Sequence, residues 1–353
     1  MTRRVVLHAP NVHTGGGLVL LQALLSGWDR KDIELALILD QRARQRLVIP
    51  DRGRVTWVPT TACARLAAEM TLRQHANMPD CLVLCFHGLP PLLPNRAKNL
   101  VFQQNRNYLG LNPLSEFSGR VRIRLLVERM LSKAFRHRVS KYVVQTSTMQ
   151  RELMHWFRSG RTDAKGPDAA ILPFMHFPLN ASAVPTAHAR WDFAYVADGE
   201  AHKNHRNLLA AWILLAQEGL RPSLALTLTK RDERLAQEID EAVRIYRLSI
   251  TNLTELSRAE IFRLYEDSRA LIFPSTSESF GLPLVEATRA GLPIIASELD
   301  YVRDVCTPVQ TFDPRSPTSI ARAVKRHLKI GEADPELLEP AEFWNTLLMQ
   351  GME

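Results

Sequence analysis

The sequence lacks the features of a membrane-spanning protein, of a small disulfide-rich protein and of a protein built around a structural metal. It has 353 residues and few cysteines, which form no pattern with histidines at metal-ligand spacing: Cys63, Cys81, Cys85 and Cys306. Cys81 and Cys85 lie in an apolar, strand-like run, so we expect buried free thiols. The longest apolar runs, such as residues 17–25, are too short to cross a bilayer.

The N-terminus lacks a targeting signal, and no part of the chain has the composition of a disordered tract. MTRRVVLHAPN has neither the long apolar core nor the cleavage site of a secretion signal, which predicts a cytoplasmic protein. Hydrophobic residues make up 46% of the chain and charged residues 23%, as is typical of a folded protein. Because 353 residues exceed what one hydrophobic core usually supports, we expect two domains with a site between them.

The charge balance is basic. The formal net charge is +8 at pH 7, and the isoelectric point is about 9.5. This favours an anionic partner, which could be nucleic acid, an acidic membrane surface or a phosphorylated small molecule. Charge alone does not choose among the three.

Strand-like and helix-like segments alternate along the N-terminal half. RRVVLHAP predicts a buried strand, NVHTGGG a glycine loop, LVLLQALLSGW a helix and IELALILD a second strand. This alternation is typical of an α/β fold with a parallel sheet and crossover helices. DCLVLCFH, NLVFQQN and KYVVQTS predict further strands that end in polar residues. Ligands of such sheets bind at the carboxyl ends of the strands.

A second α/β series follows residues 178–190, which are rich in proline, alanine and small polar residues. FAYVAD, SLALTLTK, RLSITNL and ALIFPS predict its strands, with NLLAAWILLAQEG, RAEIFRLYEDS and PLVEATRAG as helices between them. We therefore expect two Rossmann-like domains, residues 1–183 and 184–335, that face each other across a cleft. Residues 336–353 predict a terminal helix that packs back on the N-terminal domain.

Residues 273–297, FPSTSESFGLPLVEATRAGLPIIAS, place two carboxylates on either side of a turn. Glu278 lies on the loop after a strand, and Glu286 lies in the first turn or so of a helix whose start suits Pro283. Unpaired N–H groups at that start favour an anionic or oxygen-rich ligand, which Gly281 allows to approach closely. Two carboxylates there suit the hydroxyls of a ribose or hexose. Taken singly, Glu286 could only complement the helix dipole, and Glu278 could be solvated.

The complete string resembles a known motif: Pro-Ser-x-x-Glu278-x-Phe280-Gly281-Leu282-Pro283-x-x-Glu286-Ala287, then Gly291-x-Pro293. It is similar to the E-x7-E motif of retaining nucleotide-sugar glycosyltransferases with the GT-B fold. That family includes bacterial mannosyltransferases, sucrose synthases and lipopolysaccharide glycosyltransferases. The resemblance implies that Glu278 lies by the donor sugar and that Glu286 binds the ribose hydroxyls. The turn formed by Phe280, Gly281 and Leu282 would border the donor.

A basic cluster in FAYVADGEAHKNHRNLLAAW predicts the site of the donor diphosphate. Lys203 lies near a helix start, where its ammonium and the N–H groups can jointly neutralise a leaving diphosphate. Its basic neighbours could add charge but fit surface positions better: His202, His205 and Arg206. Where the family often has a Gly-Arg pair after the strand, this chain has Ala197-Asp198-Gly199. Diphosphate binding would thus need Lys203 and another cation, such as Lys230.

The glycine loop after the first strand supports two readings. Gly15, Gly16 and Gly17 allow close approach of a phosphate or sugar, and similar loops in GT-B enzymes border the donor and the acceptor. Alternatively, Gly15-x-Gly17 and Asp40 match part of a dinucleotide-binding fingerprint, but Leu20 occupies the place of the third glycine. We prefer the transferase to an NAD-dependent oxidoreductase.

Polar residues after two later strands should also reach the cleft. His87 follows one strand and is a catalytic candidate, although a lone histidine is more often structural. Gln104, Asn105 and Asn107 follow the next and are candidates for acceptor or sugar contact. In some family members a histidine at about the place of Gln104 or Asn105 contacts the donor sugar. Here an amide replaces it, or its role passes to His87.

Residues 120–141, RVRIRLLVERMLSKAFRHRVSK, carry six arginines and two lysines against one glutamate. The preferred interpretation is a surface helix with its apolar stripe in the core: Ile123, Val127, Met130 and Ala134. The alternative is a basic amphipathic surface that recruits an anionic membrane, where a lipid-linked acceptor would reside. Nucleic-acid binding is disfavoured because the basic residues are not interleaved with exposed aromatics.

The resemblance implies a retaining, metal-independent glycosyltransferase of bacterial surface-polysaccharide synthesis. It would move a sugar from a UDP-, GDP- or ADP-sugar to a glycan or lipid-linked acceptor, without a cofactor, in the cytoplasm or at the inner face of the plasma membrane. The chain has no Asp-x-Asp pair of the kind that holds a divalent metal in many GT-A transferases. A non-catalytic scaffold with the same fold is the other alternative.

Overall fold

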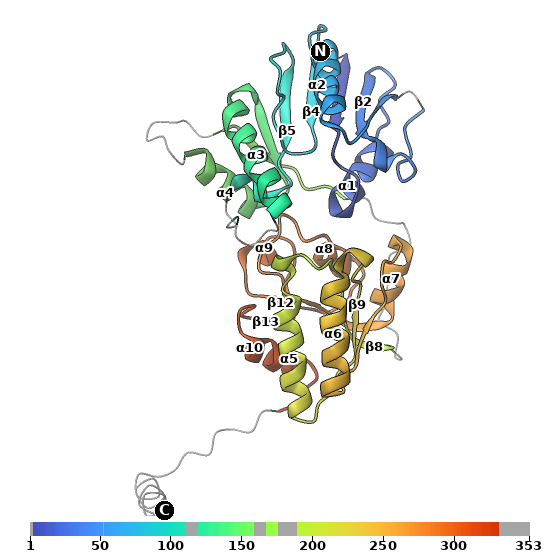
Figure 1. Cartoon of the computed structure of the whole chain (residues 1–353), viewed down its shortest axis with the longest axis vertical. Helices are drawn as coiled ribbons and strands as arrows, with labels where there is room; N and C mark the ends of the chain where they lie inside the picture. The colour runs from blue at the N-terminus through green and yellow to red at the C-terminus, as the bar shows by residue number, and fades with distance from the viewer. Residues whose placement is uncertain are drawn as a thin grey trace, which may run out of the picture.

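The computed structural model describes residues 3–51, 53–110, 114, 119–158, 167–175 and 189–331. The described chain forms two lobes, each built on one parallel sheet with helices against its faces (Figure 1). The expected α/β class with two Rossmann-like domains is confirmed. The predicted boundary between residues 183 and 184 and the predicted helix over residues 336–353 lie outside the described residues.

The N-terminal sheet has seven parallel strands in the order β3-β2-β1-β4-β5-β6-β7. The strands are β1 (Arg4–Ala9), β2 (Glu34–Asp40), β3 (Arg54–Val58), β4 (Cys81–Cys85), β5 (Lys98–Phe102), β6 (Lys141–Val144) and β7 (Ala169–Ile171). The helices are α1 (Gly15–Ser26), α2 (Ala62–Ala76), α3 (Gly119–Phe135) and α4 (Ser147–Arg158). A 3-10 turn, Arg106–Leu109, follows β5.

The central strands of this sheet are buried on both faces, as expected for near-continuous apolar runs. Because side chains alternate along a strand, Val6 of β1 packs with Leu72 of α2 and Leu153 of α4 in one cluster. The next residue, Leu7, joins Leu21 of α1 in a second cluster on the opposite face. The sheet therefore has a layer of helices on each side, and its polar loops gather at the carboxyl ends of the strands.

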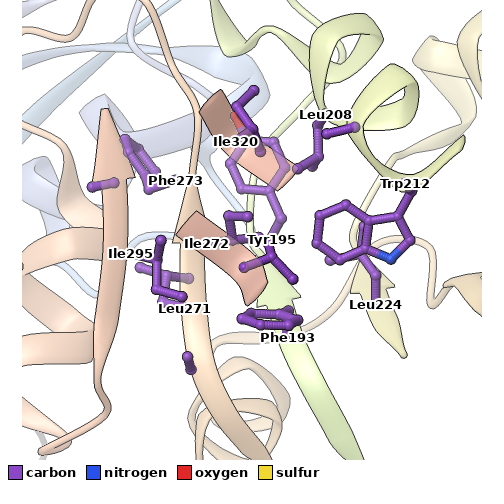
Figure 2. Packing of buried hydrophobic residues seen from close by; sticks show 14 of the residues in the cluster. Phe193, Tyr195, Leu208, Trp212, Leu224, Leu271, Ile272, Phe273, Ile295 and Ile320 are labelled. Carbon is purple, nitrogen blue, oxygen red and sulfur yellow. The ribbon is translucent and has the colours of Figure 1, made fainter. Parts of the chain in front are cut away.

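The C-terminal sheet has six parallel strands in the order β10-β9-β8-β11-β12-β13. They are β8 (Trp191–Tyr195), β9 (Leu224–Leu226), β10 (Ile250–Asn252), β11 (Ser268–Phe273), β12 (Ile294–Ser297) and β13 (Gln310–Phe312). The helices are α5 (His205–Gln217), α6 (Glu233–Tyr246), α7 (Arg258–Glu266), α8 (Leu282–Arg289), α9 (Asp300–Arg303) and α10 (Pro317–His327). Figure 2 shows the core, where Trp212 of α5 packs edge-to-face on Phe193 of β8 with ring centroids 5.7 Å apart.

The two lobes touch through side chains that follow the carboxyl ends of their strands. Leu282, the first residue of α8, packs against the apolar cluster of the N-terminal lobe. The backbone N–H of Arg106 donates to Ser279 Oγ at 3.3 Å, and that of Thr148 donates to Asp304 Oδ2 at 2.8 Å. The loops that carry the predicted site residues are thus part of the interface between the lobes.

Two expectations about side chains need correction. All four cysteines are free thiols, but only Cys81 and Cys85 are buried, while Cys63 is exposed. In α3, Ile123, Val127 and Met130 point to solvent rather than into the core, because the helix packs on a different face. No helix within the described ranges is long and apolar enough to cross a bilayer.

Candidate functional site

The loop between β11 and α8 carries both predicted carboxylates. Gly281 caps α8 with φ +72°, a left-handed conformation that favours glycine, and Pro283 occupies the first turn, as expected. Phe280 is buried. Glu278 therefore lies on the loop, and Glu286 is the fifth residue of the helix.

Glu278 forms an ion pair with Lys203, 75 residues away in the sequence. Lys203 Nζ lies 2.7 Å from Glu278 Oε1, and the two side chains are only 15% and 11% exposed. Burial lowers the pKa of Lys203, but the carboxylates of Glu278 and Asp198 outweigh burial and raise it above its ordinary value. The ammonium is therefore charged at neutral pH, and in this state of the protein Glu278 neutralises it.

Backbone contacts between neighbouring strand ends hold this pair in place. Tyr195, at the end of β8, donates its hydroxyl to the Lys203 carbonyl at 2.6 Å. The Thr276 N–H donates to the His202 carbonyl at 2.8 Å, which joins the loop after β8 to the loop after β11. Asn204 adopts φ +63° and donates to the carbonyl of Pro274 at 3.0 Å. Lys203 thus precedes α5, as the sequence predicts, and points toward the loop that carries Glu278.

Glu286 lies in a separate buried environment. Tyr265 donates its hydroxyl to Glu286 Oε2 at 3.2 Å, and Arg258 Nη2 lies 3.6 Å from Oε1. Burial raises the pKa of this carboxyl above its ordinary value, although the Arg258 charge acts in the opposite direction. Tyr265 and Arg258 are not singled out by the sequence analysis, since both lie on a separate helix, α7.

Gly199, a predicted donor-binding residue in the turn before Lys203, packs closely against the protein's own Asp232. A Cβ on Gly199 would lie 2.6 Å from Asp232 Oδ1, so a larger residue would displace that side chain. His205 was expected on the surface but is buried, and its Nε2 lies 2.8 Å from the Asp198 carbonyl. Burial lowers its pKa to about 4. Lys230 is exposed on the turn that follows β9.

The glycine loop of the N-terminal lobe meets the helix start of the C-terminal lobe. Gly15 has φ +63°, and a Cβ on Gly16 would lie 2.7 Å from Leu282 Cδ1. A Cβ on Gly17 would lie 3.5 Å from Gln104 Oε1. The loop that carries Gly15 to Gly17 therefore lies beside Leu282 and Gln104, which the sequence also singles out.

Asp40 is not free to bind a ribose. Arg42 donates to its two carboxylate oxygens from Nε at 3.0 Å and from Nη2 at 2.7 Å, and the Arg42 N–H adds a third bond at 2.9 Å. The side chain is 1% exposed. The dinucleotide-binding interpretation depends on this carboxylate, so the structure removes its main support.

His87 and the amides after β5 are engaged in structural contacts. His87 is buried, its Nδ1 lies 3.1 Å from the His8 carbonyl, and burial lowers its pKa to about 4. Gln104 donates to the Phe86 carbonyl at 2.7 Å. The Asn105 side chain accepts the N–H of Asn107 at 3.0 Å and so caps the 3-10 turn. Their contacts with substrate stay predictions.

Arg106 is an interface residue that the sequence analysis did not single out. Its N–H contacts Ser279, the neighbour of Glu278, and its Nε donates to Glu152 Oε2 at 2.8 Å. Within the described ranges, no group of histidine, cysteine and acidic side chains could hold a metal ion.

The C-terminal lobe matches a known family over much of its length. Residues 181–341 match the model described as glycosyl transferases group 1. The chain is 30% identical over 167 residues to the serotype-specific mannosyltransferase WbdA of Escherichia coli. The aligned region covers 46% of this chain and 20% of WbdA. It is also 32% identical over 114 residues to O-antigen chain mannosyltransferase B of Escherichia coli. That region covers 31% of this chain and 29% of the relative. The aligned region thus spans about a fifth of the length of WbdA.

Solved structures resemble the whole chain. Sucrose-phosphate synthase from Thermosynechococcus elongatus superposes with a TM-score of 0.67 at 16% identity, covering 93% of this chain and 90% of that one. Anabaena Alr3699/HepE, solved with UDP and glucose, gives 0.66 at 14% identity, covering 92% and 90%. The lipopolysaccharide outer core galactosyltransferase WaaB gives a TM-score of 0.60 at 12% identity. The superposition covers 94% of this chain and 92% of WaaB. At these identities the likeness shows the fold, and the expected GT-B architecture is confirmed.

Proposed function

We propose that this protein, whose residues 181–341 match the glycosyl transferases group 1 family model, transfers a sugar from a nucleoside-diphosphate sugar to a hydroxyl of a glycan or lipid-linked acceptor in surface-polysaccharide synthesis. The observation that carries the proposal is the Lys203–Glu278 pair at 2.7 Å. Lys203 lies just before α5 and Glu278 lies on the loop that leads into α8, where the two lobes meet. The relatives named as mannosyltransferases favour a hexosyl donor.

The chemistry assigned to Lys203 is stabilisation of the leaving diphosphate. Its raised pKa keeps the ammonium charged, and a charged donor held in a mostly buried position stabilises developing negative charge better than water does. The start of α8 adds the partial positive charge of a helix N-terminus. Glu286, on the same helix, would accept hydrogen bonds from the ribose hydroxyls.

Transfer would proceed with retention. The bond from the anomeric carbon to the diphosphate oxygen breaks, and the acceptor oxygen bonds the same carbon from the same face. The acceptor proton passes to the departing phosphate oxygen, so no separate base is needed. This suits a site where the candidate catalytic histidine, His87, is buried and bonded to the backbone. Charge neutralisation by Lys203 would take the place of a metal.

The proposal is tested by a thermal-shift panel of UDP-, GDP- and ADP-sugars beside NAD, with and without EDTA. A ligand at one hundred times its dissociation constant adds about 2.7 kcal/mol of stability. We expect one nucleotide-sugar class to raise the melting temperature and the shift to survive EDTA. NMR of the anomeric proton of the product then tests retention.

Two outcomes would contradict the proposal. A shift with NAD alone would indicate an oxidoreductase. Binding of nucleotide sugars without any transfer or donor hydrolysis would indicate a scaffold that retains the donor site.

A further inference from the structure

Helix α3 exposes an apolar stripe that the described part of the chain leaves uncovered. Ile123 and Met130 are 66% and 63% exposed, and Leu126 and Val127 are each 48% exposed. Their spacing of i, i+3, i+4 and i+7 places them on one side of the helix. The opposite side carries the buried residues: Leu125, Glu128 and Ser132. Contiguous exposed apolar surface of this kind marks an interaction site.

Basic side chains border the stripe on both sides. At 100° per residue, Arg122 and Lys133 fall on one flank of the stripe and Arg124 on the other. All three are exposed, and Arg124 also lies 3.7 Å from Glu128 Oε2. Long basic side chains at the edges of an apolar face can keep their charges in water while their stems cover apolar surface.

We propose that α3 lies in the surface of an anionic lipid bilayer, with Ile123, Leu126, Val127 and Met130 among the acyl chains and the flanking basic residues at the headgroups. This combination of a narrow apolar stripe, cationic borders and a chain with net charge +8 is complementary to an acidic membrane. Arg122, Arg124 and Lys133 border the stripe with charges of one sign, as an acidic lipid surface requires. We therefore assign the stripe to lipid rather than to a protein partner.

The contacts of α3 link this surface to the candidate site. Arg129, on the same helix, donates from Nε to the Asn107 carbonyl at 2.8 Å. The adjacent Arg106 N–H contacts Ser279 beside Glu278. Figure 1 shows α3 in the N-terminal lobe. A membrane-bound α3 would hold the interface between the lobes near the bilayer, so the inference deepens the proposed function by assigning a lipid-anchored acceptor.

The test is co-sedimentation of the full chain with vesicles of phosphatidylglycerol and phosphatidylcholine, compared with vesicles of phosphatidylcholine alone. We expect binding to the anionic vesicles that weakens with salt. The combined variant Arg122→Gln/Arg124→Gln/Lys133→Gln should bind on the order of 100-fold more weakly, since each basic residue near an anionic surface contributes about a factor of five. The variant Ile123→Ser/Val127→Ser/Met130→Ser should lose binding by at least tenfold.

Matched controls change exposed residues elsewhere. Arg3→Gln/Arg54→Gln/Arg269→Gln removes the same charge from exposed positions, and Ile245→Ser removes an exposed apolar side chain of α6. Both should bind vesicles within a factor of about three of the wild type, since their charges and apolar surface lie off α3. Equal loss in the charge control would show only a non-specific effect of net charge and would overturn the assignment to α3.

Two further measurements separate this inference from the proposed function. Melting temperature and nucleotide-sugar binding should be unchanged in the serine variant, because it changes only exposed apolar side chains of α3. If no nucleotide sugar binds but vesicle binding depends on α3, the proposed function fails and the membrane surface stands. If the wild type ignores anionic vesicles, or if analytical ultracentrifugation shows a dimer that the serine variant abolishes, the stripe is an interface between copies and the inference is wrong.

Discussion

Replacement of Glu278 by glutamine should tighten the binding of free nucleoside diphosphate while it slows transfer. In the structure the Lys203 ammonium forms an ion pair with the Glu278 carboxylate, with Nζ 2.7 Å from Oε1. A diphosphate that binds Lys203 must compete with this carboxylate and is repelled by it. Glutamine keeps the shape and a hydrogen-bond acceptor but removes the negative charge.

The size of the effect follows from the geometry of the pair. A phosphate oxygen in contact with the same ammonium lies about 5–6 Å from the carboxylate, where unit charges repel by about 3 kcal/mol at an effective dielectric constant of 20. Water and salt at the interface between the lobes reduce this to about 1 kcal/mol, a factor of about five in affinity. The free protein should lose about 1–3 kcal/mol of stability, because Lys203 and Glu278 are 15% and 11% exposed and glutamine pairs less strongly with an ammonium.

Isothermal titration calorimetry with UDP and GDP measures the affinity, and urea unfolding measures the stability. Glu238→Gln is the matched control, because Glu238 pairs with Arg206 on the exposed surface of the same lobe. The control should leave both quantities nearly unchanged. Weaker nucleotide binding by Glu278→Gln would refute the reasoning, since it would mean that Lys203 does not bind the diphosphate in competition with Glu278.

Three further predictions follow from other contacts. Gly16→Val should lower kcat/KM at least tenfold, because even a Cβ at this position would lie 2.7 Å from Leu282 Cδ1. Addition of Leu282→Ala to this variant should recover part of the lost activity, and no recovery would refute the steric account. Acid should destabilise both lobes between pH 6.5 and about 4, because folded His87 and His205 have pKa values of about 4 and stay neutral while the unfolded residues gain protons. Each histidine contributes about 2–3 kcal/mol to the loss of unfolding free energy across that window. Urea unfolding at pH 7 and pH 4.5 should therefore show a smaller loss of stability for His205→Gln than for the wild type. An equal loss would contradict the assignment. Glu286→Gln should keep or raise the melting temperature at pH 7, because burial raises the pKa of that carboxyl, yet bind nucleotide sugar about tenfold more weakly in a thermal-shift titration; unchanged binding would remove Glu286 from the donor site.

The sequence predicts the alternation of strands and helices because parallel strands that are buried on both faces are nearly continuous apolar runs. The edges were harder to predict. β7 and β13 have three residues each, too short to show a pattern, and β3 alternates exposed and half-buried side chains at the margin of its sheet. Such strands are specified by pairing with a neighbour, which the sequence does not display.

The pairing of Lys203 with Glu278 depended on strand order. The sequence places each residue just after a strand, but a parallel sheet can place those strands at any separation. In the structure β8 and β11 are hydrogen-bonded neighbours, so the loops that follow them meet. The prediction for His205 was wrong for a related reason: at a helix start a polar ring can point inward when a carbonyl, here that of Asp198, accepts a hydrogen bond from it.

Helix α3 is the place where hydropathy predicted the wrong face. Its sequence offers an apolar stripe at Ile123, Val127 and Met130, yet the lobe buries Leu125, Ser132 and the carboxylate of Glu128, whose pKa burial raises. Burying a large apolar side chain typically contributes about 1.5–3 kcal/mol, so leaving several in water gives up much of the stability of an ordinary domain. A helix that hides a glutamate and exposes isoleucine and methionine is poorly adapted to water alone. It is well adapted to a setting in which lipid covers the stripe and the basic borders meet acidic headgroups.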